Sequence, residues 1–295
     1  MLKSLAAAAV LSLAAVPANA ATAVSQLGSM SPAAYAPEVL APSPAVSAEK
    51  RFDPNAPFNY AQRPAAASPE GGAWAVTNVR WGRLPADLKT YDWRTASVNP
   101  ALLTGVYYGY KKAGVGHSFF VFSFSGGGFV SADGAEGGLM TTGAEGWSRE
   151  PKGYNVVEGV RDLYPLIWNT TTLESYADYT VNKAHSELYL ARINISPEKA
   201  RELLLNTFAR MNETNRSGEF YNGFTNNCTT NPVDLLNAVL PKKQRISGSV
   251  FSATFPVTAV HAYVRKDVLG PFSSHLELGK DNVSFPFNPA PYVLR

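Results

Sequence analysis

The sequence predicts an α+β domain with a central antiparallel sheet, and two local patterns carry this prediction. Residues 115–124 (VGHSFFVFSF) are aromatic or β-branched on both alternating faces, which is typical of a strand buried on both sides. Ser196-Pro197-Glu198 supplies an N-cap, a proline at the first helical position and an early acid. Apolar residues then recur every 3.6 residues to about Asn215, which indicates an amphipathic helix.

Further elements are expected on either side of these two. Residues 125–128 (SGGG) should form a turn into a strand at 129–131, so that this strand and 115–124 make a hairpin in the centre of the sheet. Residues 188–195 predict a strand, and 229–240 a short helix that ends before a proline. Strand-like segments at 250–255 and 259–264 complete the α+β assignment.

The chain is expected to contain one domain, at 73–295. Residues 1–20 have the three regions of a secretory signal peptide in the usual order. Lys3 is followed by an apolar stretch and then by Ala18-Asn19-Ala20, after which cleavage is expected. Residues 21–72 are rich in alanine, proline and serine, which predicts a disordered linker. A periplasmic location is therefore expected, with at most transient contact with the membrane.

The composition excludes several classes of function. Of the 295 residues, 45% are hydrophobic and 17% charged, so the chain can bury a sizeable core. The net charge of +3 gives no electrostatic footprint for nucleic acid or for tight binding to anionic lipid. Cys228 is the single cysteine, which excludes an intramolecular disulfide and a multi-thiolate zinc site. We expect neither a metal nor a cofactor.

Cys228 is a candidate nucleophile because a polar turn places it at the start of the helix expected at 229–240. The helix dipole and unpaired amide donors there favour the thiolate. Pro232 would disrupt a helix begun at Asn227, so the cysteine is expected in the turn just before the helix. The alternative interpretation is an inert, buried cysteine, since this residue is commonly a small core hydrophobe.

His117 is the expected base, because an imidazole near the start of a strand of phenylalanine and valine can face a cleft. A cysteine and a histidine within hydrogen-bond reach provide a nucleophile and a general acid and base for acyl transfer. Asn227 could donate to the developing oxyanion. The alternative for His117 is a hydrogen-bonded core histidine.

In four places the sequence resembles the family of the Lnb N-terminal periplasmic domain, over about residues 76–240. The most specific element is the block from Phe220-Tyr221-Asn222 to Asn226-Asn227-Cys228-Thr229-Thr230. The other matching stretches are Asn78-Val79-Arg80-Trp81, Gly116-His117-Ser118-Phe119-Phe120 and Ser196-Pro197-Glu198-Lys199-Ala200-Arg201.

The resemblance implies a circularly permuted papain-like (NlpC-like) fold, because the histidine strand precedes the cysteine, the reverse of papain. The family usually shows Ser-x-Glu-x-Arg after the histidine strand, and we match this pattern to residues 131–135, with Asp133 in the position of the glutamate. Asp133 is therefore expected to orient His117, while the arginine is missing. The membrane-spanning portion of the family's namesake, a lipoprotein N-acyltransferase, is also missing.

These observations predict a periplasmic thiol-dependent acyltransferase or hydrolase that acts through an acyl-thioester on Cys228. Its substrate would be an acyl-bearing or peptide component of the cell envelope, including lipid or lipoprotein acyl groups. One alternative is a cysteine peptidase or amidase of cell-wall peptides. The other is a catalytically inactive module that binds an envelope ligand in the same cleft.

Overall fold

The computed structural model describes residues 57–84, 87–112, 116–150, 153–247, 254–281 and 283, with the backbone alone at 83–84 and 87–90. The predicted signal peptide and residues 21–56 of the predicted linker lie outside the described residues. The strands are β1 (Ala66–Glu70), β2 (Ala73–Leu84), β3 (Asp87–Val98), β4 (Leu103–Lys111), β5 (His117–Phe124), β6 (Phe129–Ser131), β7 (Leu139–Gly146), β8 (Tyr164–Thr172), β9 (Leu188–Arg192), β10 (Phe220–Tyr221) and β11 (Leu276–Leu278). The helices are α3 (Val156–Gly159), α4 (Leu173–Ala177), α5 (Pro197–Ser217), α6 (Thr230–Val239) and α8 (Pro256–Val264), with a π-helical turn η4 (Asp178–Lys183) and the short 3-10 turns η3 (Pro100–Leu102), η5 (Lys242–Gln244) and η6 (Phe272–Ser274).

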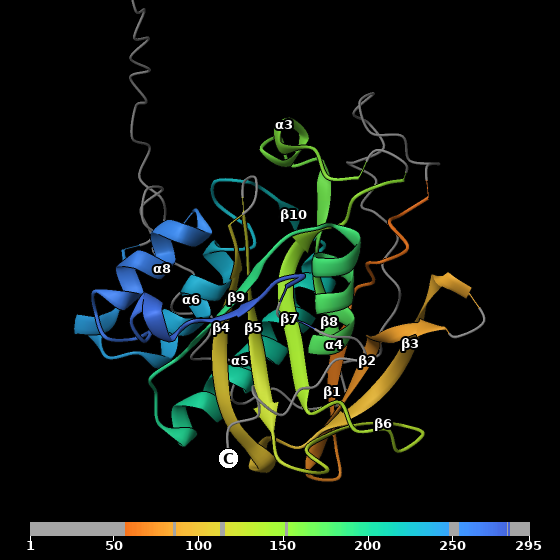
Figure 1. The fold of residues 1–295 in the computed structure, drawn as a ribbon, viewed down its shortest axis with the longest axis horizontal. Helices are drawn as coiled ribbons and strands as arrows, with labels where there is room; N and C mark the ends of the chain where they lie inside the picture. Colours follow the sequence, from red (N-terminus) through yellow and green to blue (C-terminus); the bar gives the residue numbers. More distant parts are fainter. Residues whose placement is uncertain are drawn as a thin grey trace, which may run out of the picture. The chain divides into compact units, whose positions relative to one another are not determined.

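One mixed sheet organises these elements and confirms the α+β class (Figure 1). Nine strands run across it in the order β11-β9-β4-β5-β7-β8-β2-β3-β6, while β1 pairs with β2 and β10 with β8. The β2 and β8 strands are parallel, whereas the other pairs are antiparallel. The expected central antiparallel sheet is therefore present around β5, but the sheet as a whole is mixed.

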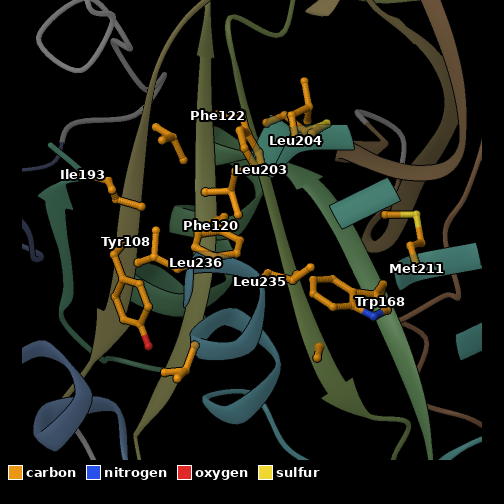
Figure 2. Packing of buried hydrophobic residues seen from close by; sticks show 14 of the residues in the cluster. Tyr108, Phe120, Phe122, Trp168, Ile193, Leu203, Leu204, Met211, Leu235 and Leu236 are labelled. Atoms are coloured by element: carbon orange, nitrogen blue, oxygen red, sulfur yellow. The ribbon is translucent and has the colours of Figure 1, made fainter. Parts of the chain in front are cut away.

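The strand β5 is buried on both sides, as its sequence predicts. Phe120 and Phe122 belong to a core formed with α5, α6 and α8, and Figure 2 shows Phe120, Leu203 and Leu236 within it. Phe119 and Val121 face the other way, against residues of α4 and η4. Alternation along a strand thus divides the apolar side chains between two cores.

The predicted long helix is confirmed as α5. The Ser196 hydroxyl accepts a hydrogen bond from the Lys199 N–H, and Pro197 occupies the first helical position. Gly218 ends the helix in the left-handed conformation, at φ 63°. The buried stripe follows the predicted spacing: Ala200, Leu203, Leu204, Thr207, Phe208, Met211 and Thr214.

The predicted hairpin in the centre of the sheet is wrong. The chain does turn at residues 125–128, but β6 pairs with β3 at the edge of the sheet and not with β5. The neighbour of β5 on that side is β7. Three residues of β6 carry too little local information to choose between these partners, since register depends on long-range packing.

The domain begins earlier than residue 73, which corrects the expected end of the linker. The strand β1 pairs with β2 along its whole length, and Ala65 and Ala67 are fully or nearly fully buried. The side chain of Asn212 on α5 bonds both the N–H and the carbonyl of Ala67, and Asn215 donates to the Ala65 carbonyl. Small residues are needed here for close contact with α5, so an alanine-rich composition does not mark a linker at this point.

The segment predicted as a strand at 259–264 is instead part of the helix α8. Pro256 stands at its first position, and the buried residues Pro256, Ala259, Val260 and Tyr263 are spaced three and four apart. In a short β-branched and aromatic segment this helical spacing is easily read as a strand. Most of the other expected strand, 250–253, lies outside the described residues.

Candidate active site

Cys228 lies in the turn between β10 and α6, just before the helix, as predicted. The first residue of α6 is Thr230, and Cys228 is 7% exposed. The hydroxyl of Tyr221 on β10 donates to its Sγ atom across 3.6 Å. Thr229, next to the cysteine, has its Oγ1 atom 3.2 Å from the Ser118 Oγ of β5, so the start of α6 is held against this strand.

The side chain of Asn227 shapes this turn and does not point to a substrate. Its Oδ1 atom accepts from the N–H groups of Thr229 and Thr230 at 2.7 and 2.9 Å, and its Nδ2 atom donates to the Gly223 carbonyl at 2.8 Å. Both ends of the amide are therefore occupied, and the residue is 1% exposed. The expected role of Asn227 as an oxyanion donor is corrected to that of a cap for the first turn of α6.

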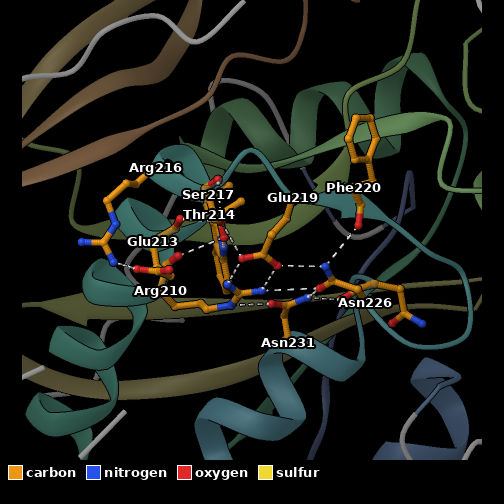
Figure 3. Close-up of polar contacts among 11 residues, drawn as sticks. Arg210, Glu213, Thr214, Arg216, Ser217, Glu219, Phe220, Asn226 and Asn231 are labelled. Atoms are coloured by element: carbon orange, nitrogen blue, oxygen red, sulfur yellow. Dashed lines mark hydrogen bonds and ion pairs between the residues drawn. The ribbon is translucent and has the colours of Figure 1, made fainter. Parts of the chain in front are cut away.

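A second polar network anchors the turn from the other side (Figure 3). Arg210 on α5 binds both carboxylate oxygens of Glu219, at 2.5 and 2.6 Å, and its Nε atom donates to Asn231 Oδ1 on α6. Asn226 donates to Glu219 and accepts from Asn231. Bidentate arginine–carboxylate pairs fix geometry as well as charge, so this network joins two helices and the cysteine turn.

His117 and Glu145 lie where the ladder between two strands stops. The β5 and β7 strands pair only over Phe120–Ser123 and Leu139–Thr142, so the ends that carry His117 and Glu145 are outside the ladder. The His117 Nε2 atom is 3.6 Å from Glu145 Oε1, and the two side chains are 14% and 15% exposed. Glu145 Oε2 accepts from Gln62 Nε2 at 2.6 Å and from Asn169 Nδ2 at 3.4 Å.

The titration of the three groups is interdependent. Burial by itself raises the pKa of Cys228, but His117, the Tyr221 hydroxyl and the Ser118 backbone N–H lower it, and the net direction is down. Burial lowers the pKa of His117, but the Cys228 thiolate and Glu145 together raise it by more than burial lowers it, so the net direction is up. Burial raises the pKa of Glu145, while His117, Gln62 and Arg80 bring it below its usual value. This arrangement favours a thiolate–imidazolium pair beside a carboxylate.

Asp133, predicted as the orienting carboxylate, is not near His117. It follows β6 beyond the last residue of β5, whereas His117 is the first residue of β5. Asp133 is 64% exposed and forms an ion pair with Arg94 at 2.9 Å. The acid beside the histidine is Glu145, so the prediction of Asp133 is corrected to Glu145.

A cleft of about 470 Å³ joins these residues. Cys228, His117, Glu145 and Tyr221 line it, together with the two cationic side chains of Arg80 and Lys111. Its other lining residues are Asn59, Ala61, Gln62, Gly116, Gly146, Ser148, Gly153, Tyr154, Val156, Asn169, Tyr176, Tyr179 and Thr180.

The sequence profile of one protein family, described as the Lnb N-terminal periplasmic domain, matches residues 89–265. The chain belongs to this family. The match includes His117, Glu145 and Cys228, and it confirms the resemblance seen in the sequence. A periplasmic location fits a family of periplasmic domains. Comparisons with curated proteins and with solved structures find no match.

In this Lnb N-terminal domain, residues 131–135 retain only the serine of the Ser-x-Glu-x-Arg pattern, whereas the acid beside His117 lies in residues 143–147. Only the glutamate is retained there, as Glu145, with Gly143 and Trp147 in the outer positions. The signal that could have identified it was a lone acid, Glu145, at the end of an otherwise uncharged stretch of a buried strand.

Two features are absent from the described residues. None of their helices combines the length and the apolar character of a membrane span. They contain no cluster of three or more histidine, cysteine or acidic side chains that could hold a metal ion.

Proposed function

We propose that this domain catalyses thiol-dependent acyl transfer or hydrolysis through a thioester on Cys228. The observation that carries the proposal is the grouping of Cys228, His117 and Glu145 around one cleft, with the pKa of the thiol lowered and that of the imidazole raised. An inert core cysteine is not expected to have a histidine beside it and a carboxylate beside that histidine.

The proposed reaction has two steps. The Cys228 thiolate attacks the carbonyl carbon of an amide or ester, and the His117 imidazolium gives its proton to the leaving amine or alcohol as the C–N or C–O bond breaks. His117 then takes a proton from water or from an acceptor amine or alcohol, which attacks the thioester and releases the Cys228 thiolate. Glu145 holds the ring and stabilises its charged form.

The backbone N–H of Cys228 is the proposed donor to the oxyanion. No acceptor for it occurs among the described residues, whereas the N–H groups of Asn227, Thr229 and Thr230 are all bonded. It also lies at the positive end of α6. A nucleophile on a helix start after a histidine strand is the arrangement of a permuted papain-like enzyme, which we propose for this domain.

The cleft favours a peptide substrate over a lipid acyl chain. Ala61 and Val156 are the only aliphatic side chains among its described lining residues, and the others are polar, aromatic or glycine. Burying an acyl chain requires apolar surface, because each methylene contributes about 0.8 kcal/mol only when it leaves water for an apolar environment. A peptidase or amidase is therefore the second candidate, ahead of a phospholipid-dependent transferase.

The proposal is tested by incubating the protein with labelled phospholipid, lipoprotein and muropeptide pools and measuring its intact mass. We expect an acyl or peptidyl adduct on Cys228, removed by hydroxylamine, and the pool that gives it identifies the donor. The Cys228→Ser variant should fold normally and lose turnover. If that variant keeps all function, the domain is a binding module and the proposal is wrong.

A further inference from the structure

Four residues that line this cleft each carry a buried polar side-chain atom without a hydrogen-bond partner. The atoms are Arg80 Nη2, His117 Nε2, Asn169 Oδ1 and Thr180 Oγ1. Buried polar groups in folded proteins are almost always paired, so such a concentration requires an explanation. The proposed mechanism uses His117 and leaves the other three unexplained.

Arg80 is the most unusual of them, because a guanidinium that is 1% exposed has no anionic partner among the described residues. Its Nε atom donates to Ser175 Oγ at 3.1 Å and its Nη1 atom to the Ala61 carbonyl at 2.8 Å. These bonds fix the plane of the guanidinium and leave Nη2 free. The rings of Tyr91 and Tyr179 lie 4.7 and 5.1 Å from its Cζ atom.

The charge of the cleft also points to an anion. Arg80 and Lys111 are the cations among its lining residues, and Glu145 is the acid, already engaged by His117, Gln62 and Asn169. Burial lowers the pKa of both Arg80 and Lys111, and it outweighs the opposing influence of Glu145 on each of them. An anionic ligand in this cleft would remove that cost.

We propose that Arg80 is the anion subsite of the cleft and binds a carboxylate of the substrate through Nη2. This inference rests on the proposed function. A carboxylate fits because a single free guanidinium nitrogen offers one point of contact. The described lining residues include two aliphatic side chains, Ala61 and Val156, which offer little surface for the acyl chains that accompany a phospholipid phosphate. Thr180 Oγ1 is a second donor for the same ligand, and Asn169 Oδ1 accepts from an N–H. The substrate class is thus an amide or ester that carries a carboxylate, as peptides do.

The test compares two small molecules that differ in one charge. N-acetylglycine carries a carboxylate, and N-acetylglycinamide is its neutral counterpart. We expect N-acetylglycine to slow the alkylation of Cys228 by iodoacetamide in a saturable way, at a concentration at least tenfold lower than N-acetylglycinamide, the ratio for one charge-assisted hydrogen bond. Inorganic phosphate, the third probe, should protect no better than N-acetylglycinamide.

Substitutions test whether Arg80 is the residue that binds the carboxylate. Arg80→Gln should abolish the difference between the acid and the amide, and Arg80→Lys should keep part of it. Arg94→Gln is the matched control, because Arg94 is paired with Asp92 and Asp133 away from the cleft, and it should behave as the wild type. Circular dichroism checks that the variants fold. If Arg80→Gln does not fold, the comparison of the two ligands on the wild type still tests the proposal.

The outcomes separate this proposal from the proposed function. Calorimetry with Cys228→Ala measures N-acetylglycine binding without any thiol chemistry, so an unreactive cysteine would overturn the function alone. Equal binding of acid and amide, or an unchanged difference in Arg80→Gln, would overturn the subsite and leave the thiol chemistry standing. Protection by phosphate alone would overturn the assignment of a carboxylate.

Discussion

The Nε2 atom of His117 lies 3.6 Å from Oε1 of Glu145, across the point where β5 and β7 are no longer paired. The contact joins residues on two strands that the sequence does not show to be neighbours. After the Cys228 thiolate, Glu145 is the group that raises the pKa of the imidazole, and the imidazole in turn lowers the pKa of the Cys228 thiol.

Glu145→Gln is therefore expected to make Cys228 less reactive. Removing the carboxylate lowers the pKa of His117, so that less imidazolium remains to stabilise the thiolate. The alkylation rate with iodoacetamide at pH 7 should fall about tenfold, the equivalent of about 1.4 kcal/mol. Asp133→Asn is the control and should leave the rate unchanged. A loss of reactivity in Asp133→Asn equal to that in Glu145→Gln would contradict the assignment.

His117→Ala is expected to move the pH dependence of alkylation upward. In the wild type the pKa of the thiol is below its usual 9.0, so the rate rises and levels off at a lower pH than for a free cysteine. Without His117, burial is the main remaining influence and raises the pKa of the thiol. The midpoint of the rate profile should therefore move above 9.0. A profile identical to the wild type would show that His117 and Cys228 are not coupled.

The same pair makes stability depend on pH. The pKa of His117 is higher in the folded state than its usual 6.5, so its contribution is complete below 6.5 and is lost as the pH rises through the folded pKa. The pKa of Cys228 is lowered from 9.0, so its contribution is complete above 9.0 and is lost as the pH falls through the folded pKa. The Cys228 thiolate and the His117 imidazolium are therefore present together at pH values between the folded pKa of Cys228 and that of His117.

Local patterns in the sequence were sufficient for some elements and not for others. The helix α5 and the buried strand β5 were predictable because the cap of Ser196 and the apolar alternation act within a few residues. The position of Cys228 before α6 followed from Pro232 in the same way. The lone charge of Glu145 in β7 marks it as unusual, but its contact with His117 was not predictable. That contact depends on β7 lying beside β5, and nothing in the two segments indicates that they pair. Asp133 lies closer to His117 in the sequence but at the other end of β5.

Gly109→Ala tests the packing that supports the histidine strand. An added Cβ would lie 2.1 Å from the Phe119 ring, and this ring packs on Tyr176, with centroids 4.6 Å apart. The core would have to shift, at a cost of roughly 1–3 kcal/mol in the free energy of unfolding. Gly82→Ala, where a Cβ meets nothing within 4 Å, is the matched control in β2. Urea unfolding measures both, and equal midpoints would mean that Phe119 can move without loss.

A chain shortened to residues 73–295 tests the start of the domain and its link to the site. This chain lacks β1, so Asn212 and Asn215 lose their backbone partners at Ala67 and Ala65. It also lacks Gln62, which donates to Glu145, and Ala61, whose carbonyl accepts from Arg80. Compared with a chain of residues 21–295, we expect a loss of about 3 kcal/mol or more in the free energy of unfolding, since each net hydrogen bond contributes about 1 kcal/mol. The alkylation rate of Cys228 in the remaining folded protein should also fall, because Glu145 is no longer held by Gln62. Equal stability and reactivity in the two chains would show that the segment 57–72 contributes neither to the folded domain nor to its site.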